Sequence, residues 1–297
     1  MCFKKIKGIK NPVNFSLICL RIVLEQAKMT QQKYLHGYQD IEQERLRHQA
    51  AVIEKPIYDF VDFSNHKELL EIGSGVGAQT EILLRRFPHL SITGVEYESK
   101  QIAKAEANLN QLGYSSPQVR FVQQDARFLE LGKKFDAAFI CWVLEHISDP
   151  IQVLRSMKPH LLPNAKVVIT EVFNATFYTF PMIPAIMDYW KIYNNFQVQI
   201  GGDPQVGVRL GDLLEASGYS NISLRSGGFH LDGRNPEDKE TVFAYWKGLM
   251  SSGAPALLEE GLITSEQLQA MQNAMDELAK KEDSVFYYRF IQATATA

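Results

Sequence analysis

The chain has 297 residues, of which 45% are hydrophobic and 22% are charged, and its formal net charge is −3 at pH 7. These values are typical of an ordinary globular protein, and the missing basic excess argues against nucleic acid as the main partner. Cys2, Cys19 and Cys141 form no CxxC pattern. The cysteine spacing therefore argues against a disulfide framework and a structural zinc site and fits a reducing, cytoplasmic compartment.

Residues 1–33 begin with lysines ahead of an apolar run at 13–24, a pattern that superficially resembles a signal peptide. However, Arg21 interrupts the run, no small-x-small cleavage site follows, and the run is shorter than the roughly 20 residues that a bilayer requires. We expect an N-terminal extension outside the core, without stable membrane insertion. Two interpretations stay open: an amphipathic helix, or residues upstream of a natural start at Met29.

Residues 34–60 are polar and favour a helix. Leu46, Ala50 and Ile53 recur at helical spacing, and Asp40 is a suitable N-cap. We therefore predict an N-terminal helical cap over this range, ahead of the main sheet.

Strands and helices alternate regularly from residue 66 to residue 172. Short apolar runs that predict strands alternate with longer segments at helical spacing, which indicates βαβ units and a mainly parallel sheet. The predicted strands are 67–73, 91–97, 119–125, 135–142 and 166–172, and the predicted helices are 77–87, 99–113 and 149–161. Sheets of this kind bind ligands at the carboxyl ends of their strands. We predict that 66–172 is a cofactor-binding core.

The chain changes character after Val172. Residues 173–206 are rich in aromatic side chains, lack clear strand alternation, and occupy a place suited to a substrate lid. We predict that 207–297 holds a helical insert and a last strand at 285–295, hairpin-paired with a strand near Ile222. Together with the helical cap, these parts are expected to form a single domain over 34–297.

A glycine-rich turn follows the first predicted strand. Residues 73–78 read GSGVGA and satisfy the dinucleotide fingerprint G-x-G-x-x-G/A if Ala78 fills the last place. Glu96 lies 23 positions beyond Gly73, where a ribose-binding acid is expected. Glycines let the backbone approach a ligand closely, and the following helix presents unpaired N–H groups. On this turn alone, an NAD(P)-dependent oxidoreductase stays possible.

Further motifs follow in order along the chain. Glu71 stands two residues before the glycines, and the series E-I-G-S-G-V-G, G-V-E-Y, Q-D-A and F-D-A-A-F-I-C resembles the class I S-adenosylmethionine-dependent methyltransferases. Residues 157–172 resemble the helix-loop-strand of the small-molecule (type 11/12-like) branch, although Lys158 and Pro159 lack the glycine pair usual there. The resemblance implies an α/β, Rossmann-like, seven-stranded mainly parallel sheet with helices on both faces and an antiparallel last strand.

The resemblance also implies a cofactor, S-adenosyl-L-methionine, and roles for its ligands. Glu96 would accept both ribose hydroxyls, Asp125 would hold the adenine edge, and Glu71 would contact the amino group. Tyr34, Tyr38, Arg45 and Gln49 would close over the methionine end, with Arg45 on its carboxylate. The cofactor-binding residues expected on this basis are Tyr38, Arg45, Glu71, Gly73, Ser74, Gly75, Gly77, Glu96, Tyr97, Gln101, Asp125, Ala126, Arg127, Cys141 and Trp142.

Simpler interpretations of several of these residues stay open. Asp125 could be an ordinary helix cap, and Arg45 an ordinary helix-surface arginine. Tyr97 and Trp142 could pack in the core rather than face a sulfonium.

Methyl transfer to an acceptor needs a nucleophile held in line with the methyl group and a base if that nucleophile arrives protonated. His146, just past the fourth strand, is the best-placed candidate base, with Glu145 and His230 as weaker alternatives. The aromatic segment suggests an apolar or aromatic small-molecule acceptor, although its side chains could instead pack against the C-terminal helices. The predicted substrate-binding residues are Phe177, Tyr178, Tyr189, Trp190 and Tyr193.

The motif after the fourth strand, CWVLEH, lacks the N/D-P-P-Y/F/W type signature of nucleic-acid amino-methyltransferases. We therefore expect methylation of an O, N or C nucleophile on a small molecule, with no metal. The rival hypotheses are the oxidoreductase and a non-catalytic S-adenosylmethionine-binding module.

Overall fold

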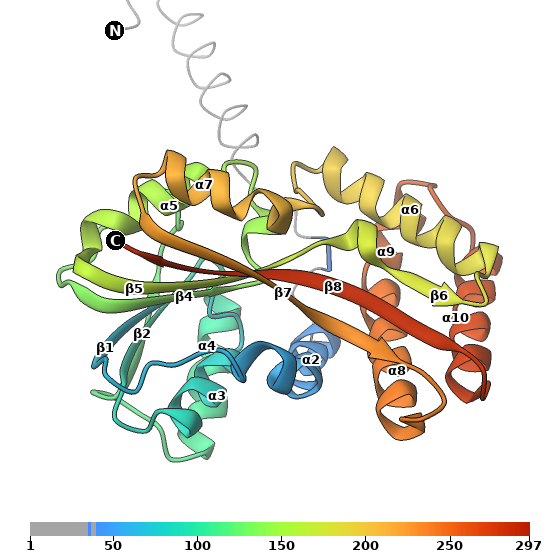
Figure 1. Ribbon diagram of the computed structural model, residues 1–297, viewed down its shortest axis with the longest axis horizontal. Coiled ribbons are helices and arrows are strands. Elements are labelled where there is room, and N and C mark those ends of the chain that lie inside the picture. Colours follow the sequence, from blue (N-terminus) through green and yellow to red (C-terminus); the bar gives the residue numbers. More distant parts are fainter. Residues whose placement is uncertain (1–34, 37–39) are drawn as a thin grey trace, which may run out of the picture. The chain divides into compact units, whose positions relative to one another are not determined.

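The computed structural model describes Leu35, His36 and residues 40–297, and the described strands form one mixed sheet (Figure 1). The strand order is β3-β2-β1-β4-β5-β8-β6, and β7 pairs with β8. The strands are β1 (Glu68–Ile72), β2 (Ser91–Glu96), β3 (Val119–Gln123), β4 (Phe135–Cys141), β5 (Leu161–Val172), β6 (Tyr178–Phe180), β7 (Ser220–Leu231) and β8 (Val285–Thr296).

The first five strands are parallel, and β8 runs antiparallel to β5, β6 and β7. The mainly parallel sheet and its antiparallel last strand, predicted from the sequence, are confirmed. The described part of the sheet has eight strands, not the predicted seven, because Tyr178–Phe180 adds a short strand beside β8. With three residues, β6 is too short to show an alternating pattern.

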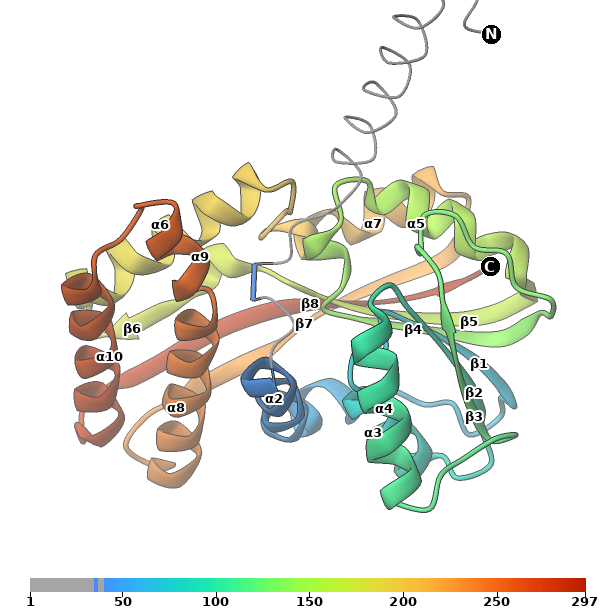
Figure 2. The same cartoon turned by 180° about the vertical axis from the view of Figure 1, so that it is seen from behind.

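Helices cover both faces of the parallel part of the sheet (Figures 1 and 2). Side chains on β4 alternate between the two layers: Phe139 joins the apolar cluster under α2, α3 and α4, whereas Ile140 joins the cluster under α5 and α7. These helices are α2 (Asp40–Tyr58), α3 (Ala78–Arg86), α4 (Ser99–Gln111), α5 (Pro150–Met157) and α7 (Leu210–Ala216). The alternation along each strand explains why both helical layers are needed to bury the sheet.

The first half of β8, with β6 and the end of β7, extends past the parallel strands and carries its own helices. Figure 2 shows α8 (Pro236–Ser252) and α10 (Ser265–Lys280) in front of this half, and α6 (Pro184–Gln199) packs against α10. The short helix α9 (Ala254–Glu259) joins α8 to α10. Phe177 stacks on Trp246 with ring centroids 5.5 Å apart, within an aromatic core that includes Phe286 and Trp190.

No helix among residues 40–297 is both long and apolar enough to span a bilayer.

Candidate functional site

The glycine turn between β1 and α3 has an unusual backbone. Gly73, Gly75 and Gly77 have φ values of 70°, 52° and 76°, which side chains with a Cβ disfavour. A Cβ at Gly73 would lie 2.5 Å from a methyl group of Val143. Gly73 N–H donates to the carbonyl of Val95 over 2.8 Å, which ties the turn to the end of β2. The turn therefore presents bare main chain at the carboxyl edge of the sheet.

Glu96, the last residue of β2, faces this turn. Its carboxylate accepts hydrogen bonds from the backbone N–H groups of Gly75 (2.9 Å), Tyr97 (2.9 Å) and Glu98 (3.0 Å). Burial raises the pKa of Glu96, and these three N–H donors oppose that shift by favouring the charged form. The hydrogen bonds fix the carboxylate beside the glycine backbone, where a diol could bridge the two.

Glu71 is a second carboxyl group at the same edge. It is 2% exposed, and the Thr80 hydroxyl donates to it over 2.6 Å. Burial is the main reason that its pKa rises to about 8, and the nearby charge of Glu96 raises it further. Glu71 is therefore mostly protonated at neutral pH, and a cation bound beside it would favour the carboxylate.

In the loop after β3, Asp125 and Arg127 bind each other. Asp125 accepts a hydrogen bond from the backbone N–H of Arg127 (2.9 Å), and its carboxylate binds the Arg127 guanidinium over distances of 2.6 to 3.2 Å. Ala126 between them is half-buried. The Arg127 amide predicted to meet an adenine thus already donates to Asp125, and the role of this loop stays a prediction.

Other predicted cofactor residues differ in exposure. Tyr97 is 48% exposed, whereas Ser74 and Gln101 are buried. The hydroxyl of Ser74 and the side-chain oxygen of Gln101 have no hydrogen-bond partner among the described residues. These buried polar atoms lie on the glycine turn and on the first turn of α4, so a ligand at this edge could satisfy them.

Cys141 and Trp142 end β4. Burial raises the pKa of the Cys141 thiol, which keeps it protonated. Trp142 has a φ of 55°, its backbone N–H donates to Thr170 over 2.9 Å, and its ring lies edge-on to Phe290. The buried indole N–H of Trp142 has no partner in the described part of the chain. The strained conformation turns the chain sharply at the end of the strand.

Sequence reasoning missed Glu171, which holds this sharp turn. Its fully buried carboxyl group, at the end of β5, accepts from the backbone N–H groups of Val143 (2.9 Å), Leu144 (2.8 Å) and Glu145 (3.3 Å). Burial and the nearby charge of Glu145 raise the pKa of Glu171 to about 8. A charged residue within the apolar strand run KVVITEV was the available signal.

A group of polar side chains gathers beside this turn from distant parts of the chain. The Gln197 amide of α6 donates to the Glu145 carboxylate over 2.9 Å, and a ring nitrogen of His146 lies 3.7 Å from Glu145. The rings of His36 and His146 meet edge-to-face with centroids 5.9 Å apart. We call the following residues the polar cluster: His36, Glu42, Arg45, Glu145, His146, Tyr193 and Gln197.

His36 was not predicted, because nothing around it in the sequence distinguishes it. Its ring nitrogens lie 2.5 Å from the Ser252 hydroxyl and 3.1 Å from the Tyr193 hydroxyl. Burial is the main reason that the pKa values of both His36 and His146 are lowered, and the positive charge of Arg45 contributes. Both histidines are therefore mainly neutral at pH 7.

Arg45, predicted to bind the cofactor's carboxylate, is a partly buried member of the polar cluster. Its guanidinium donates to Glu42 over 2.7 and 2.6 Å and to the Gln49 side chain over 2.5 Å. A cofactor carboxylate would have to share this guanidinium with Glu42, so its predicted role is still a prediction. Tyr34 and Tyr38, predicted to act with it, lie outside the described residues.

The five aromatic residues predicted to bind substrate occupy three environments. Phe177 and Trp190 belong to the aromatic core, and Tyr189 donates to the Met250 carbonyl over 3.0 Å. Tyr178 is 44% exposed on β6. Tyr193 bonds to His36 in the polar cluster. Packing alone accounts for the burial of Phe177, Tyr189 and Trp190, and substrate binding by all five residues stays a prediction.

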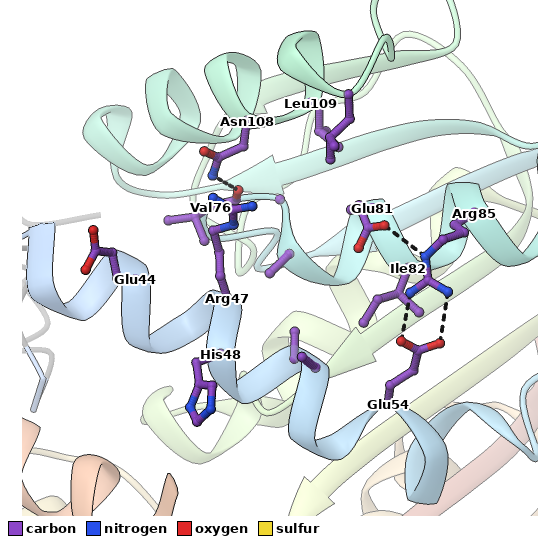
Figure 3. A pocket seen from close by; sticks show the side chains of 15 residues that line it. Glu44, Arg47, His48, Glu54, Val76, Glu81, Ile82, Arg85, Asn108 and Leu109 are labelled. Atoms are coloured by element: carbon purple, nitrogen blue, oxygen red, sulfur yellow. Dashed lines mark hydrogen bonds and ion pairs between the residues drawn. The ribbon is translucent and has the colours of Figure 1, made fainter. Parts of the chain in front are cut away.

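A separate groove of about 560 Å³ runs between α2 and helices α3 and α4 (Figure 3). Arg85 on its rim pairs with Glu54 and Glu81, and the Asn108 amide donates to the Val76 carbonyl. Among the described residues that line the groove, Gly77 is the one predicted to bind the cofactor. The charges of Arg85, Glu54 and Glu81 on the rim of the groove are thus paired with each other.

Among the described residues, no group of three His, Cys, Asp or Glu side chains is arranged to hold a metal ion.

Comparison with known proteins resolves the choice that the glycine turn left open. Residues 70–167 match the family model described as "Methyltransferase domain". The chain is 30% identical over 254 residues to malonyl-acyl-carrier-protein O-methyltransferase of Paenibacillus sp. (strain JDR-2), covering 84% of this chain and 90% of the relative. The chain belongs to the class I S-adenosylmethionine-dependent methyltransferases. S-adenosylmethionine is accordingly its cofactor, and the oxidoreductase hypothesis is not supported.

The chain is also similar to two proteins with other methyltransferase names. Trans-aconitate 2-methyltransferase of Deinococcus radiodurans is 26% identical over 176 residues, which cover 59% of this chain and 59% of that protein. A phosphoethanolamine N-methyltransferase 2 structure from Haemonchus contortus, in complex with S-adenosylhomocysteine, shares the fold with a TM-score of 0.51 and 16% identity. The alignment covers 84% of this chain and 52% of that protein.

Proposed function

We propose that the chain transfers the methyl group of S-adenosylmethionine to a small molecule bound beside the polar cluster. The observation that carries this proposal is the placement of Glu96. Its carboxylate is held against the Gly75 N–H at the end of β2, next to a turn whose three glycines all have positive φ values. A carboxylate beside bare main chain suits a ribose diol.

Each residue at this edge would bind a different part of the cofactor. Glu96 would accept the ribose hydroxyls, Glu71 would meet the amino group, and the loop at 125–127 would border the adenine. Trp142 would face the sulfonium, where an aromatic ring favours positive charge. The remaining contacts are assigned to the residues predicted from the sequence: Tyr38, Arg45, Gly73, Ser74, Gly75, Gly77, Tyr97, Gln101 and Cys141.

The bound cofactor supplies an activated methyl group, and the chain's own residues hold the acceptor in line with it and exclude water. We assign the acceptor to the neighbourhood of the polar cluster, whose side chains come from the β4 turn, α2 and α6. The relative from Paenibacillus is named an O-methyltransferase, which favours an oxygen nucleophile here. The aromatic side chains of α6 and α8 near this space favour an acceptor with an apolar or aromatic body.

His146 is the base in this proposal. Because burial lowers its pKa, it is neutral at pH 7 and able to accept a proton from a hydroxyl nucleophile as the new carbon–oxygen bond forms. The Glu145 carboxylate 3.7 Å away would stabilise the resulting imidazolium. A carboxylate nucleophile would need no base, so dependence on His146 also reports which kind of oxygen is methylated.

The experiment combines wild-type protein, methyl-labelled S-adenosylmethionine and the small-molecule fraction of a cell extract, followed by chromatography of the labelled products. We expect one or few labelled small molecules. Absence of any labelled product at all extract concentrations would favour a non-catalytic cofactor-binding module.

The variant His146→Gln tests the base. We expect unchanged affinity for S-adenosylhomocysteine and a turnover lower by roughly 10²-fold or more, the usual contribution of a positioned base. A normal turnover would remove His146 from this role.

A further inference from the structure

Gln197, in the last turn of α6, is a buried glutamine whose amide faces the turn after β4. It is 1% exposed, and its side-chain nitrogen donates to the Glu145 carboxylate over 2.9 Å and to the Glu145 carbonyl over 3.2 Å. Both partners are acceptors, so the nitrogen of the amide must face Glu145 and its oxygen must point elsewhere. No other group in the described part of the chain donates a hydrogen bond to the Glu145 carboxylate.

The Glu145 carboxylate links Gln197 to His146. Its Oε2 accepts from Gln197, and its Oε1 lies 3.7 Å from Nε2 of His146. Glu145 and His146 belong to the short 3₁₀ helix η1 (Leu144–His146), at the end of the parallel core, whereas Gln197 comes from outside that core. The amide of Gln197 therefore fixes which carboxylate oxygen faces the imidazole.

The chain that follows α6 closes on the same residue. The Gly202 N–H donates to the Gln197 carbonyl over 2.9 Å, and the Asp203 N–H donates to the Glu145 carbonyl over 2.8 Å. A Cβ at Gly202 would lie 2.6 Å from the Glu145 carbonyl oxygen and 2.9 Å from Cγ of Gln197. A larger residue at position 202 would force these groups apart, so the close approach to Glu145 depends on this glycine.

The other end of the Gln197 amide is unsatisfied. Its side-chain oxygen is buried and has no hydrogen-bond partner among the described residues, which is destabilising. An apolar side chain of similar length would avoid this penalty, but it would leave the Glu145 carboxylate without its donor. The contribution of the amide is therefore its bond to Glu145 rather than packing.

We propose that Gln197 is a positioning residue that holds the Glu145 carboxylate beside His146 for proton transfer. This inference rests on the proposed function and deepens it, because it places control of the proposed base on α6, within the segment predicted to be the substrate lid. When His146 accepts the proton of the acceptor hydroxyl, the imidazolium forms 3.7 Å from a carboxylate that Gln197 keeps in place.

Several charged and titratable groups act on His146. Burial is the main influence and lowers its pKa, the Glu145 carboxylate raises it, and on α2 Arg45 lowers it and Glu42 raises it. The His36 ring meets it edge-to-face with centroids 5.9 Å apart. Loss of the amide donor favours the neutral form of the buried Glu145 carboxyl group. The imidazolium then loses its nearest negative charge, and the pKa of His146 falls.

The test compares wild-type protein with Gln197→Met and with a matched control, Gln292→Met. Gln292 on β8 is also 1% exposed, and its amide donates to the Ile57 carbonyl and the Thr170 hydroxyl, outside the polar cluster. NMR titration of protein with isotope-labelled histidine follows His146, whose signal is identified by its loss in His146→Gln. Methyl-labelled S-adenosylmethionine with the small-molecule fraction of a cell extract gives the rate, calorimetry gives S-adenosylhomocysteine affinity, and thermal unfolding gives Tm.

A second variant, Gly202→Ala, displaces Glu145 without removing the amide. Its control is Gly248→Ala on α8, where an added Cβ meets nothing within 4 Å. We expect Gly202→Ala, and not Gly248→Ala, to move the titration midpoint of His146 to lower pH and to slow product formation.

We expect Gln197→Met to move the His146 midpoint to lower pH and to slow product formation at pH 7 by roughly 10-fold or more, with unchanged S-adenosylhomocysteine affinity. Gln292→Met should lower Tm and leave the midpoint unchanged. A wild-type midpoint in both Gln197→Met and Gly202→Ala, whatever their Tm, would overturn this inference and leave the proposed function standing. If wild-type protein labels no product, the proposed function fails, whereas the His146 titration still decides whether Gln197 holds Glu145 in place.

Discussion

The cofactor edge and the polar cluster are built in different ways. At the cofactor edge, the glycine turn, Glu71 and Glu96 come from residues 71–96, and backbone groups form most of the contacts. In the polar cluster, side chains meet from distant segments; His36 and Ser252 are 216 positions apart. The fold therefore determines the proposed cofactor edge directly, while the proposed acceptor region depends on helices added outside the parallel core. This difference explains how one fold can serve many acceptors.

The two regions also differ in charge. Two carboxyl groups, Glu71 and Glu96, lie at the cofactor edge, and burial raises the pKa of both. In the polar cluster, Arg45 is neutralised by Glu42, and the histidines are mainly neutral at pH 7. We therefore expect a cationic ligand at the cofactor edge to favour the carboxylate forms of these groups, and the neutral histidines of the polar cluster to be able to accept protons.

The largest effect should come from closing the glycine turn. Gly73→Ala places a Cβ at a positive φ and 2.5 Å from Val143, at a combined cost of roughly 2–5 kcal/mol from strain and overpacking. We expect S-adenosylhomocysteine affinity to fall at least 100-fold, measured by calorimetry. Gly113→Ala is the control, because its φ is +85° but nothing lies within 4 Å. If both variants bind equally well, the turn is not part of the cofactor site.

The next largest effect is a loss of stability at the turn after β4, beside the polar cluster. Glu171→Ala leaves three buried N–H groups, at Val143, Leu144 and Glu145, without their acceptor, and should lower the free energy of unfolding by roughly 2–4 kcal/mol. In Glu171→Gln the amide oxygen can still accept the two shorter hydrogen bonds, from Val143 and Leu144. We therefore expect the free energy of unfolding to fall by less than about 1 kcal/mol. Denaturant unfolding measures both. Equal losses would show that the turn does not depend on these hydrogen bonds.

Glu96→Ala should weaken S-adenosylhomocysteine binding by roughly 1–3 kcal/mol, the contribution of a charge-assisted pair of hydrogen bonds. Glu98→Ala is the control for charge alone, since its side chain caps α4 through the Lys100 N–H. Wild-type affinity in Glu96→Ala, or equal losses in the two variants, would remove the specific role of Glu96.

The smallest expected effect is a pH dependence from Glu71. Burial raises the pKa of Glu71 from 4.5 to about 8. The contribution of its protonated form to the free energy of unfolding is therefore fully present below pH 4.5 and is lost as pH rises through about 8. A cationic amino group bound beside it would favour the carboxylate. We therefore expect binding of S-adenosylhomocysteine at pH 7 to release up to about one proton, measured by calorimetry in buffers of different ionisation enthalpy. The same proton release from Glu71→Gln would contradict this assignment.

The proximity of the glycine turn and Glu96 was predictable because its signals are local. Strand-ending glycines and the acid at position 96 follow one another at fixed spacing, and parallel strands bring their carboxyl ends to one edge. Glu171 and His36 were missed because their contacts join segments far apart in the sequence. Composition showed that residues 173–206 are aromatic, but it left open whether Phe177 and Trp190 bind substrate or pack against the C-terminal helices, and in the structure both rings contact Trp246 of α8.

The most direct test of the central claim is a crystal structure of this chain with S-adenosylhomocysteine. We predict that the ribose hydroxyls lie within hydrogen-bond distance of the Glu96 carboxylate, with the amino-acid end against the main chain of 73–77. An adenosyl group bound elsewhere, for example in the groove between α2 and α4, would contradict the account.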